Sequence, residues 1–419
     1  MRSILGWIAT LILCSPVLVT AAHAKPAPPR SGPCVPIYGH PAASEWCSYR
    51  YGTRRTGAQP LASALSNPAK VAALSVKWSF PASPAGGFKA SPIAVNDTVF
   101  IGSQNGYFYA LDAATGALKW QFPKASDPGL LGSCGSFGRY GIQSSATFAN
   151  IGGKEAVIFG APDPEPSAEG GLGSARLFAF TLSGALIWKS DIVAHLNGCT
   201  PGSLSELHER IAYSSPLVLG DKVYMGVHDA GDSPIQNGKV VAVDLNSGKI
   251  DSKFNFISTG TRGGGVWNTP ATDGEGVYFT TGNTRCWNGG CQSEPNPNHG
   301  LSMIRVDEEN GNIVWAFQPV PYNLDDDPDW AAGATVMSTS CGELIASVQK
   351  DGWSYAVNAG NGTPGAPNVR WQFPPTGYPF DPNGTHNHGD THYKRLGAAW
   401  NNVLLITTGG ESLVQRRQS

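Results

Sequence analysis

Three consecutive glycines followed by a tryptophan form the segment best suited to hold a flat ligand. The segment reads Gly263-Gly264-Gly265-Val266-Trp267. Glycines allow the backbone to come close to a ligand, and an indole offers a large face for stacking. The alternative is that Trp267 is one more packing aromatic, but it is out of phase with the tryptophans that recur along the chain. We interpret the segment as one wall of a binding site for a planar group.

A dense acidic cluster lies further along the chain. It reads Asp325-Asp326-Asp327-Pro328-Asp329-Trp330. Carboxylates at this density repel one another unless a cation gathers them. The alternative is a solvated acidic loop. The cluster therefore predicts a cation site.

Other motifs and the net charge narrow the chemistry. The histidine-rich run at residues 385–392 matches no standard zinc spacing, so we interpret it as a polar loop. The glycine-rich run at residues 170–173 lacks the dinucleotide fingerprint and its βαβ context. The sequence contains no Cys-x-x-Cys-His motif, which excludes a c-type haem attached to it. A formal net charge of −2 gives no indication of nucleic acid or an anionic membrane as a partner.

The elements that must position these residues are visible as an internal repeat. Residues 110–120 read as a strand ending in Ala-x-Asp, a tight turn with glycine, and a strand ending in Trp120. Trp78 ends an earlier copy that lacks its front half, and Phe254 replaces the tryptophan of one later copy. The later copies are residues 179–188, 242–254, 307–315 and 356–371.

An alternating strand precedes each turn, and most of these strands have a further short strand before them, as at Ser91–Val95. The strands expected ahead of the turns are 99–102, 156–160, 222–226, 276–280 and 344–348. Four strands per unit, in units of 42 to 68 residues, are typical of propeller blades. A further unit starts at Leu396 before the sequence stops at Ser419. We therefore expect an all-β propeller of about six to seven blades, which is either a smaller ring or a ring cut short.

The first 24 residues have the features of a signal peptide. Arg2 precedes an apolar run, and Ala22-His23-Ala24 is a small-x-small cleavage site. We expect residues 25–45 to be an extension and residues 46–419 to form one propeller domain in a periplasmic or secreted protein. No later segment is long and apolar enough to span a membrane. An oxidising compartment allows disulfides, and the candidate pairs are Cys34 with Cys47, Cys286 with Cys291, and Cys134 with Cys199, leaving Cys341 as a thiol.

The repeats with their docking tryptophans resemble those of the quinoprotein alcohol dehydrogenases, which bind pyrroloquinoline quinone (PQQ) in an eight-bladed propeller. The resemblance covers roughly residues 46–410 and is greatest to the polyvinyl-alcohol-dehydrogenase-like branch. Residues 51–55 and 71–78 fit the opening strand of that family.

This resemblance implies roles for residues on the cofactor side of the site. PQQ would stack on Trp267 beside Gly264 and Gly265. Lys350, in Lys350-Asp351-Gly352-Trp353, would lie beside the reactive quinone carbonyl and stabilise charge on its oxygen. Arg139 would contact the quinone. Ser133-Cys134 stands in place of the paired cysteines of the family, so their vicinal disulfide cannot form.

The resemblance also implies a Ca²⁺ or lanthanide site. Asn283 ends a strand in Gly-Asn, and an amide oxygen suits a hard cation, although an Asx turn is the alternative. Asp327 matches the catalytic base, and Asp329 matches the extra carboxylate of lanthanide-using members. Where the family has a glutamate ligand, this sequence offers Asp232 or Asp229.

The implied activity is PQQ-dependent oxidation of a small or polymeric alcohol. Asp327 would remove the alcohol proton while the cation polarises the quinone carbonyl. Electrons would pass to a separate acceptor such as a c-type cytochrome. Two alternatives stay open, namely a propeller scaffold for protein contacts and a truncated, inactive quinoprotein.

Overall fold

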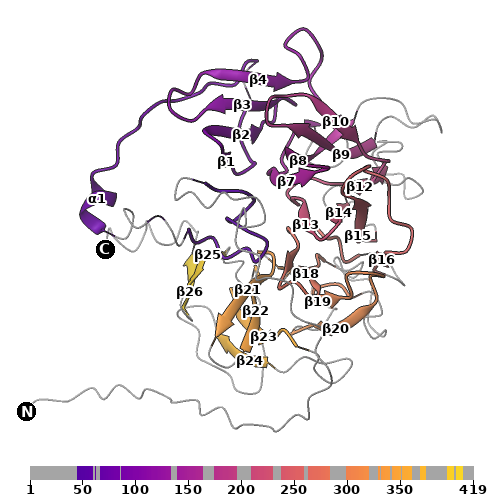
Figure 1. Cartoon of the computed structure of the whole chain (residues 1–419). Coiled ribbons are helices and arrows are strands. Elements are labelled where there is room, and N and C mark those ends of the chain that lie inside the picture. Colours follow the sequence, from indigo (N-terminus) through magenta and orange to yellow (C-terminus); the bar gives the residue numbers. More distant parts are fainter. Residues whose placement is uncertain are drawn as a thin grey trace, which may run out of the picture.

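The repeat units fold as antiparallel sheets that follow one another around a common centre (Figure 1). The computed structural model describes residues 45–59, 62, 67–84, 86–133, 139–163, 174–195, 209–229, 237–258, 263–283, 299–319, 329–330, 332–339, 342–350, 352–360, 369–373, 394–400 and 403–408. The expected signal peptide lies outside these residues. Among the described residues, no helix has the length and apolar character of a membrane span.

Five sheets have four or five strands each. The strand nearest the ring centre, called the innermost strand below, is the first of its sheet in the chain, except that the short β12 precedes it in the third sheet. The first sheet comprises β1 (Ile93–Val95), β2 (Thr98–Gly102), β3 (Phe108–Asp112) and β4 (Leu118–Phe122). The second comprises β7 (Thr147–Ile151), β8 (Lys154–Asp163), β9 (Ser174–Thr181), β10 (Leu186–Lys189) and β11 (Ala194–His195). The third comprises β12 (Glu209–Arg210), β13 (Leu217–Leu219), β14 (Lys222–Asp229), β15 (Lys239–Asp244) and β16 (Phe256–Ile257).

The fourth sheet comprises β17 (Ala271–Thr272), β18 (Val277–Thr280), β19 (Met303–Val306) and β20 (Ile313–Phe317). The fifth comprises β21 (Thr335–Thr339), β22 (Gly342–Val348), β23 (Ser354–Asn358) and β24 (Val369–Phe373). Two-stranded pairs are β5 (Gly132–Ser133) with β6 (Arg139–Tyr140), and β25 (Lys394–Trp400) with β26 (Val403–Thr408). The expected all-β architecture is confirmed, and every strand expected ahead of a turn is present.

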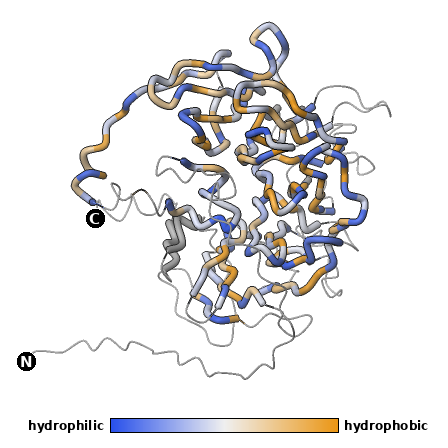
Figure 2. The backbone as a smooth tube through the Cα atoms, viewed as in Figure 1, coloured by the Kyte–Doolittle hydropathy of each residue, from blue (hydrophilic) through white to orange (hydrophobic). Residues whose placement is uncertain are grey.

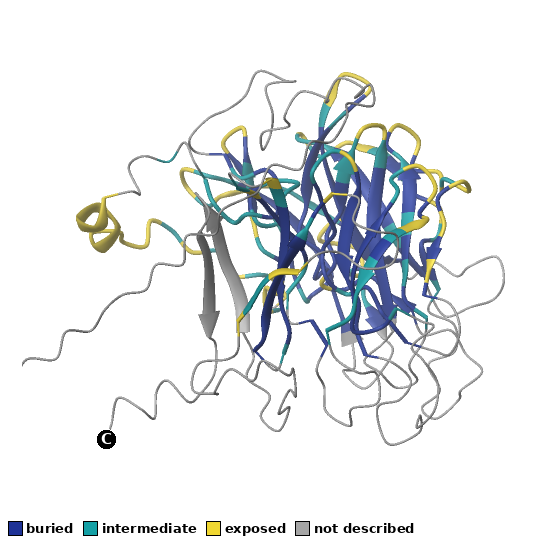
Figure 3. Ribbon diagram, turned by 90° about the horizontal axis from the view of Figure 1, so that it is seen from below, coloured by how far each residue is buried: buried dark blue, intermediate teal, exposed yellow. Residues whose placement is uncertain are grey.

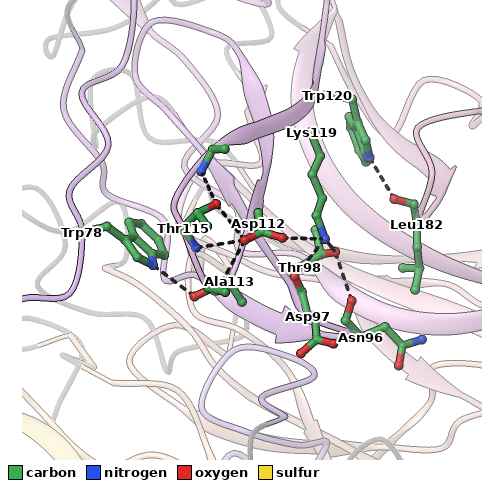
Figure 4. A network of polar contacts seen from close by, with 12 residues as sticks. Trp78, Asn96, Asp97, Thr98, Asp112, Ala113, Thr115, Lys119, Trp120 and Leu182 are labelled. Carbon is green, nitrogen blue, oxygen red and sulfur yellow. Dashed lines mark hydrogen bonds and ion pairs between the residues drawn. The ribbon is translucent and has the colours of Figure 1, made fainter.

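The turn of a repeat docks the tryptophan of the preceding unit, as seen for Trp78, Trp120, Trp188 and Trp315. Asp112 accepts hydrogen bonds at its carboxylate from the backbone and hydroxyl of Thr115, which fixes the turn (Figure 4). Trp78 Nε1 donates to the carbonyl of Ala113 at 3.0 Å, and Trp120 Nε1 donates to the next unit in the same way (Figure 4). At Gly116 an added Cβ would lie 2.7 Å from the Trp78 indole, so the turn glycine is required for docking as well as for its φ of 74°.

The sheets bury their faces against one another, while many of their turns are exposed (Figure 3). Hydrophobic and hydrophilic residues alternate along many of the strands (Figure 2). Phe108 stacks on Phe159 of the second sheet with ring centroids 3.8 Å apart. The opposite face of the first sheet carries Tyr109, which packs against Phe80. Residues 78–82 thus cover the face of the first sheet that has no described sheet on it.

One expectation about the lead-in is wrong. Residues 71–78 do not form a strand, because α1 (Pro68–Ala72) is helical and residues 74–80 follow it without pairing. Asn67 caps the helix by accepting from Ala69 N at 2.9 Å, and Pro68 is pre-organised for the first turn. Cys47 is disulfide-bonded, and its partner lies outside the described residues, as do all other cysteines.

The segment 45–57 crosses the middle of the ring (Figure 1). Trp46 exchanges two backbone hydrogen bonds with Ala94 of β1. Backbone amides of β7, β17 and β21 donate to carbonyls of the same segment, at Cys47, Thr53 and Arg54. Innermost strands have an unpaired edge facing the centre, and this segment satisfies part of it on four sheets.

Arg55 extends these contacts to the third sheet. Its guanidinium donates to the carbonyls of Pro216 and Pro270, which precede β13 and β17, at 3.1 and 2.8 Å. Three more bonds go to Ser48, Tyr49 and Gly52 of the segment itself. The side chain is 1% exposed, and burial lowers the pKa of Arg55 to about 9, which leaves it charged at neutral pH.

Replacing Arg55 by leucine is expected to lower the free energy of unfolding by about 3 kcal/mol or more, because buried carbonyls lose their donors. Equilibrium urea unfolding measures this change. The matched control is Arg54→Leu, which removes a partly exposed ion pair with Glu343 and is expected to cost less than about 1 kcal/mol. Equal effects of the two variants would contradict the central role given to Arg55.

Candidate functional site

Hydrogen bonds to side-chain hydroxyl groups link the first four sheets just ahead of their innermost strands. Ser91 N donates to Ser145 Oγ, Ser145 N donates to Ser215 Oγ, and Ser215 N donates to Thr269 Oγ1, at 2.9, 3.0 and 3.0 Å. These residues stand two positions before β1, β7, β13 and β17. Equivalent positions of neighbouring sheets therefore meet, and the residues just before them face one end of the ring centre.

Trp267 stands two residues before Thr269, and backbone packing holds its segment. Gly263 and Gly264 have φ values of 138° and 73°, which favour glycine. Gly264 N donates to the Asn283 carbonyl at 2.8 Å, and the Gly265 carbonyl accepts from Gly282 N at 2.7 Å. Gly263 is also held by the Ser258 hydroxyl, which donates to its carbonyl at 2.6 Å, so the segment is fixed between the third and fourth sheets.

Trp267 and Asp329 meet although they come from different sheets. Trp267 Nε1 donates to Asp329 Oδ2 at 3.2 Å. Lys350 Nζ forms an ion pair with Asp329 Oδ1 at 2.6 Å and lies 5.6 Å from the centre of the Trp267 ring. The backbone reinforces this arrangement, since Lys350 N donates to the Asp329 carbonyl at 2.8 Å. Three residues singled out in the sequence thus form one cluster of an indole, a carboxylate and an ammonium group.

Asn283 lies at the edge of this cluster. Asn283 is buried. A Cβ added to its chain neighbour Gly282 would lie 3.5 Å from Asp329 Oδ2 and 3.4 Å from Trp267 Cδ1. The backbone just before Asn283 therefore lies beside the contact between Trp267 and Asp329, and Asn283 and Asp329 are two of the residues expected to bind a metal. Among the described residues, no group of three or more histidine, cysteine, aspartate or glutamate side chains gathers as a metal site.

The structure does not describe the side chains of the remaining expected site residues. Asp327 and Asp232 lie outside the described residues. The backbone of Arg139 pairs with Ser133, but neither side chain is described, and the same holds for the side chain of Asp229.

The structure adds an aromatic and cationic neighbourhood that the motif analysis missed. The Tyr213 ring meets Trp267 edge-on, and it stacks on His228, with centroids 6.4 Å apart in each case. On the strand next to His228, the Arg210 guanidinium lies 3.8 Å over the buried Tyr140 ring. The sequence could have indicated Tyr213, because it precedes Ser-Ser-Pro-Leu at the same position at which Trp267 precedes Asn-Thr-Pro-Ala.

The cluster fits a flat anionic group. Trp267 offers a partly exposed indole, and Lys350 supplies positive charge beside it. The donor set for a hard cation is partial, since Asn283 and Asp329 are the expected ligands that the structure describes, and Ca²⁺ takes six to eight oxygens. Asp329 is in addition already paired with Lys350.

Comparisons with known proteins identify the family and the fold. Residues 49–382 match the model of the PQQ family, described as the β-propeller domain of glucose/ethanol/alcohol dehydrogenases. The dehydrogenase subunit of a quinone alcohol dehydrogenase from Gluconobacter oxydans is 26% identical over 374 residues, covering 77% of this chain and 44% of the relative. Quinoprotein alcohol dehydrogenase PedH of Pseudomonas putida is 24% identical over 281 residues, covering 59% and 41%.

Solved structures show the same fold. A europium-containing methanol dehydrogenase superposes with a TM-score of 0.60 at 18% identity, covering 81% of this chain and 59% of that one. A quinohemoprotein alcohol dehydrogenase of Pseudomonas putida gives 0.56 at 19% identity, covering 78% and 48%. The expected resemblance is confirmed at the level of the family, but not for the polyvinyl-alcohol-dehydrogenase-like branch. The chain spans less than half the length of the curated relatives it matches.

The Lys350–Asp329 pair generates a testable expectation. Lys350→Met leaves a carboxylate that is 5% exposed without its cation, so we expect a loss of about 3 kcal/mol in the free energy of unfolding. In a double-mutant cycle with Asp329→Asn, measured by urea unfolding, the two effects should fall short of additivity by about 1–3 kcal/mol. The control is Lys119→Met, which breaks a more exposed pair with Asp112 and should cost under about 1 kcal/mol. Additive effects at 350 and 329 would show that the pair is not coupled.

Proposed function

Because this chain belongs to the PQQ family of glucose/ethanol/alcohol dehydrogenase β-propeller domains, we propose that it is a PQQ-dependent dehydrogenase that oxidises an alcohol. The observation that carries the proposal is the meeting of Trp267, Lys350 and Asp329 at one end of the ring centre. Fold alone would not support an activity, since one fold serves many functions. An indole beside an ammonium and a carboxylate can stack on a flat ligand and bind its polar groups.

Each residue of the cluster has a separate task in this proposal. Trp267 provides the stacking face for the cofactor, and its N–H holds the Asp329 carboxylate in place. Lys350 keeps its charge next to the stacking face, where it stabilises negative charge on a bound oxygen. Gly264 and Gly265 keep the indole in position. PQQ, when bound, supplies the two-electron oxidant, and a bound cation supplies a Lewis acid.

We assign proton removal from the alcohol to Asp327. It stands two positions before Asp329 in the sequence and matches the catalytic base of the family. A carboxylate beside a cation stays ionised and can accept the proton. Asp329 is less suited to this task, because its carboxylate already forms an ion pair with Lys350 and accepts a hydrogen bond from Trp267.

The metal proposed is Ca²⁺ or a lanthanide. Asn283 and Asp329 would supply part of its oxygen ligands, and Asp327 and Asp232 would supply more. Arg139 is proposed as a further contact of the quinone. A periplasmic or secreted location, a separate electron acceptor such as a c-type cytochrome, and a small or polymeric alcohol substrate complete the proposal.

Reconstitution tests this function directly. The purified protein with PQQ and Ca²⁺, or a light lanthanide, should bind PQQ and reduce a dye in the presence of small or polymeric alcohols. Folded protein that takes up no PQQ under these conditions would refute the assignment.

Two variants separate binding from chemistry. Trp267→Ala is expected to raise the dissociation constant of PQQ about tenfold by removing the stacking face, whereas Trp371→Ala in the outer strand β24 should not. Asp327→Ala should keep PQQ binding but lose at least about a hundredfold in turnover with the dye. Full turnover in Asp327→Ala would remove Asp327 from the role of base.

A further inference from the structure

Four residues, Trp267 among them, stand four positions before the innermost strands of their sheets. Lys89, Gln143, Tyr213 and Trp267 hold this position ahead of β1, β7, β13 and β17. The hydrogen bonds to the hydroxyl groups of Ser145, Ser215 and Thr269, two residues later, keep these positions in register. Four sheets therefore each contribute one residue at a position equivalent to that of Trp267, the proposed stacking residue.

Tyr213 is held in an unusual conformation at this position. Its φ is 67°, in the left-handed region that a tyrosine adopts only at a cost, and such strain often marks a functional position. The ring is fixed edge-on to Trp267 and stacked on His228, yet the residue is still 42% exposed. The backbone thus holds the exposed Tyr213 ring beside the Trp267 indole.

Lys89 reaches Tyr213 across the second sheet. Its ammonium lies 3.4 Å from the Tyr213 hydroxyl and 5.7 Å from the centre of the ring, although the two residues are 124 positions apart in sequence. The segment of Lys89 is anchored by the Gly87 carbonyl, which accepts from Gln104 N at 2.9 Å. Among the described residues, no carboxylate forms an ion pair with Lys89, whereas Lys350 has Asp329.

We propose that Lys89, held beside Tyr213, is a second anchor for the carboxylate groups of the cofactor, in addition to Lys350. PQQ is a flat ring system with three carboxylates, so a single lysine beside the indole leaves negative charge unmatched. Lys89 supplies a charge-assisted hydrogen bond, and the Tyr213 hydroxyl supplies a neutral one. This inference rests on the proposed function and names residues that position its cofactor.

Binding measurements with PQQ and its trimethyl ester test the proposal without any assay of activity. Lys89→Met should weaken PQQ binding about tenfold, as judged by quenching of tryptophan fluorescence, and should reduce its dependence on salt. The same variant should bind the uncharged trimethyl ester as the wild type does. Lys89→Arg should restore most of the affinity for PQQ, and Tyr213→Phe should cause a smaller loss.

The matched control is Lys124→Met, an exposed lysine beyond the outer strand β4, which should change neither ligand's binding. If Lys89→Met binds PQQ as tightly as the wild type, the second anchor is refuted while the proposed function stands. If Lys89→Met weakens the ester and PQQ equally, the residue acts by packing and the charge assignment fails. If the wild-type protein binds no PQQ, both the anchor and the proposed function fail.

Discussion

Satisfying the inner edges of the sheets is the constraint on which the rest of this structure depends. Each innermost strand would leave backbone donors and acceptors facing the ring centre, where unpaired groups are costly. The segment 45–57 occupies that centre and bonds to strands of four sheets, and Arg55 adds the third sheet through two carbonyls. A single guanidinium with five donors in a fixed fork suits this task, because it can serve several carbonyls at once. The ring is thus held from the inside as well as by the tryptophans docked outside.

The same constraint explains why the candidate site lies where it does. Once the innermost strands are held in place, the residues just before them are presented around one end of the centre. Trp267 comes from the entry to the fourth sheet, while Asp329 and Lys350 come from the fifth. None of these residues forms a site within its own unit. The cluster exists because the fourth and fifth units meet beside Trp267, where Asn268 Nδ2 donates to the Trp330 carbonyl at 3.0 Å.

The cluster holds an ammonium group in a fixed place beside an aromatic face. Asp329 neutralises Lys350 in the absence of a ligand and is itself nearly buried, so the ammonium is already held beside the indole. Pre-organisation of this kind lowers the entropy lost when a ligand binds. Aromatic rings from two sheets complete the surroundings, with Tyr213 edge-on to Trp267.

Local patterns determined the sheets and the turns. Alternation, the Ala-x-Asp turn with glycine, and the docking tryptophans are written in contiguous residues, so the strands and the propeller could be predicted from the sequence. The motif ending in Trp267 was found in the same way. The one local error, a strand at residues 71–78, arose because the resemblance outweighed the helix signal of Asn67 and Pro68. Tertiary structure alone decided that Asp329 binds Lys350 and Trp267, that Arg55 fills the centre, and that Lys89 reaches Tyr213. These contacts join residues between 21 and 215 positions apart, and no sequence periodicity encodes which side chains meet when separate sheets close around an axis.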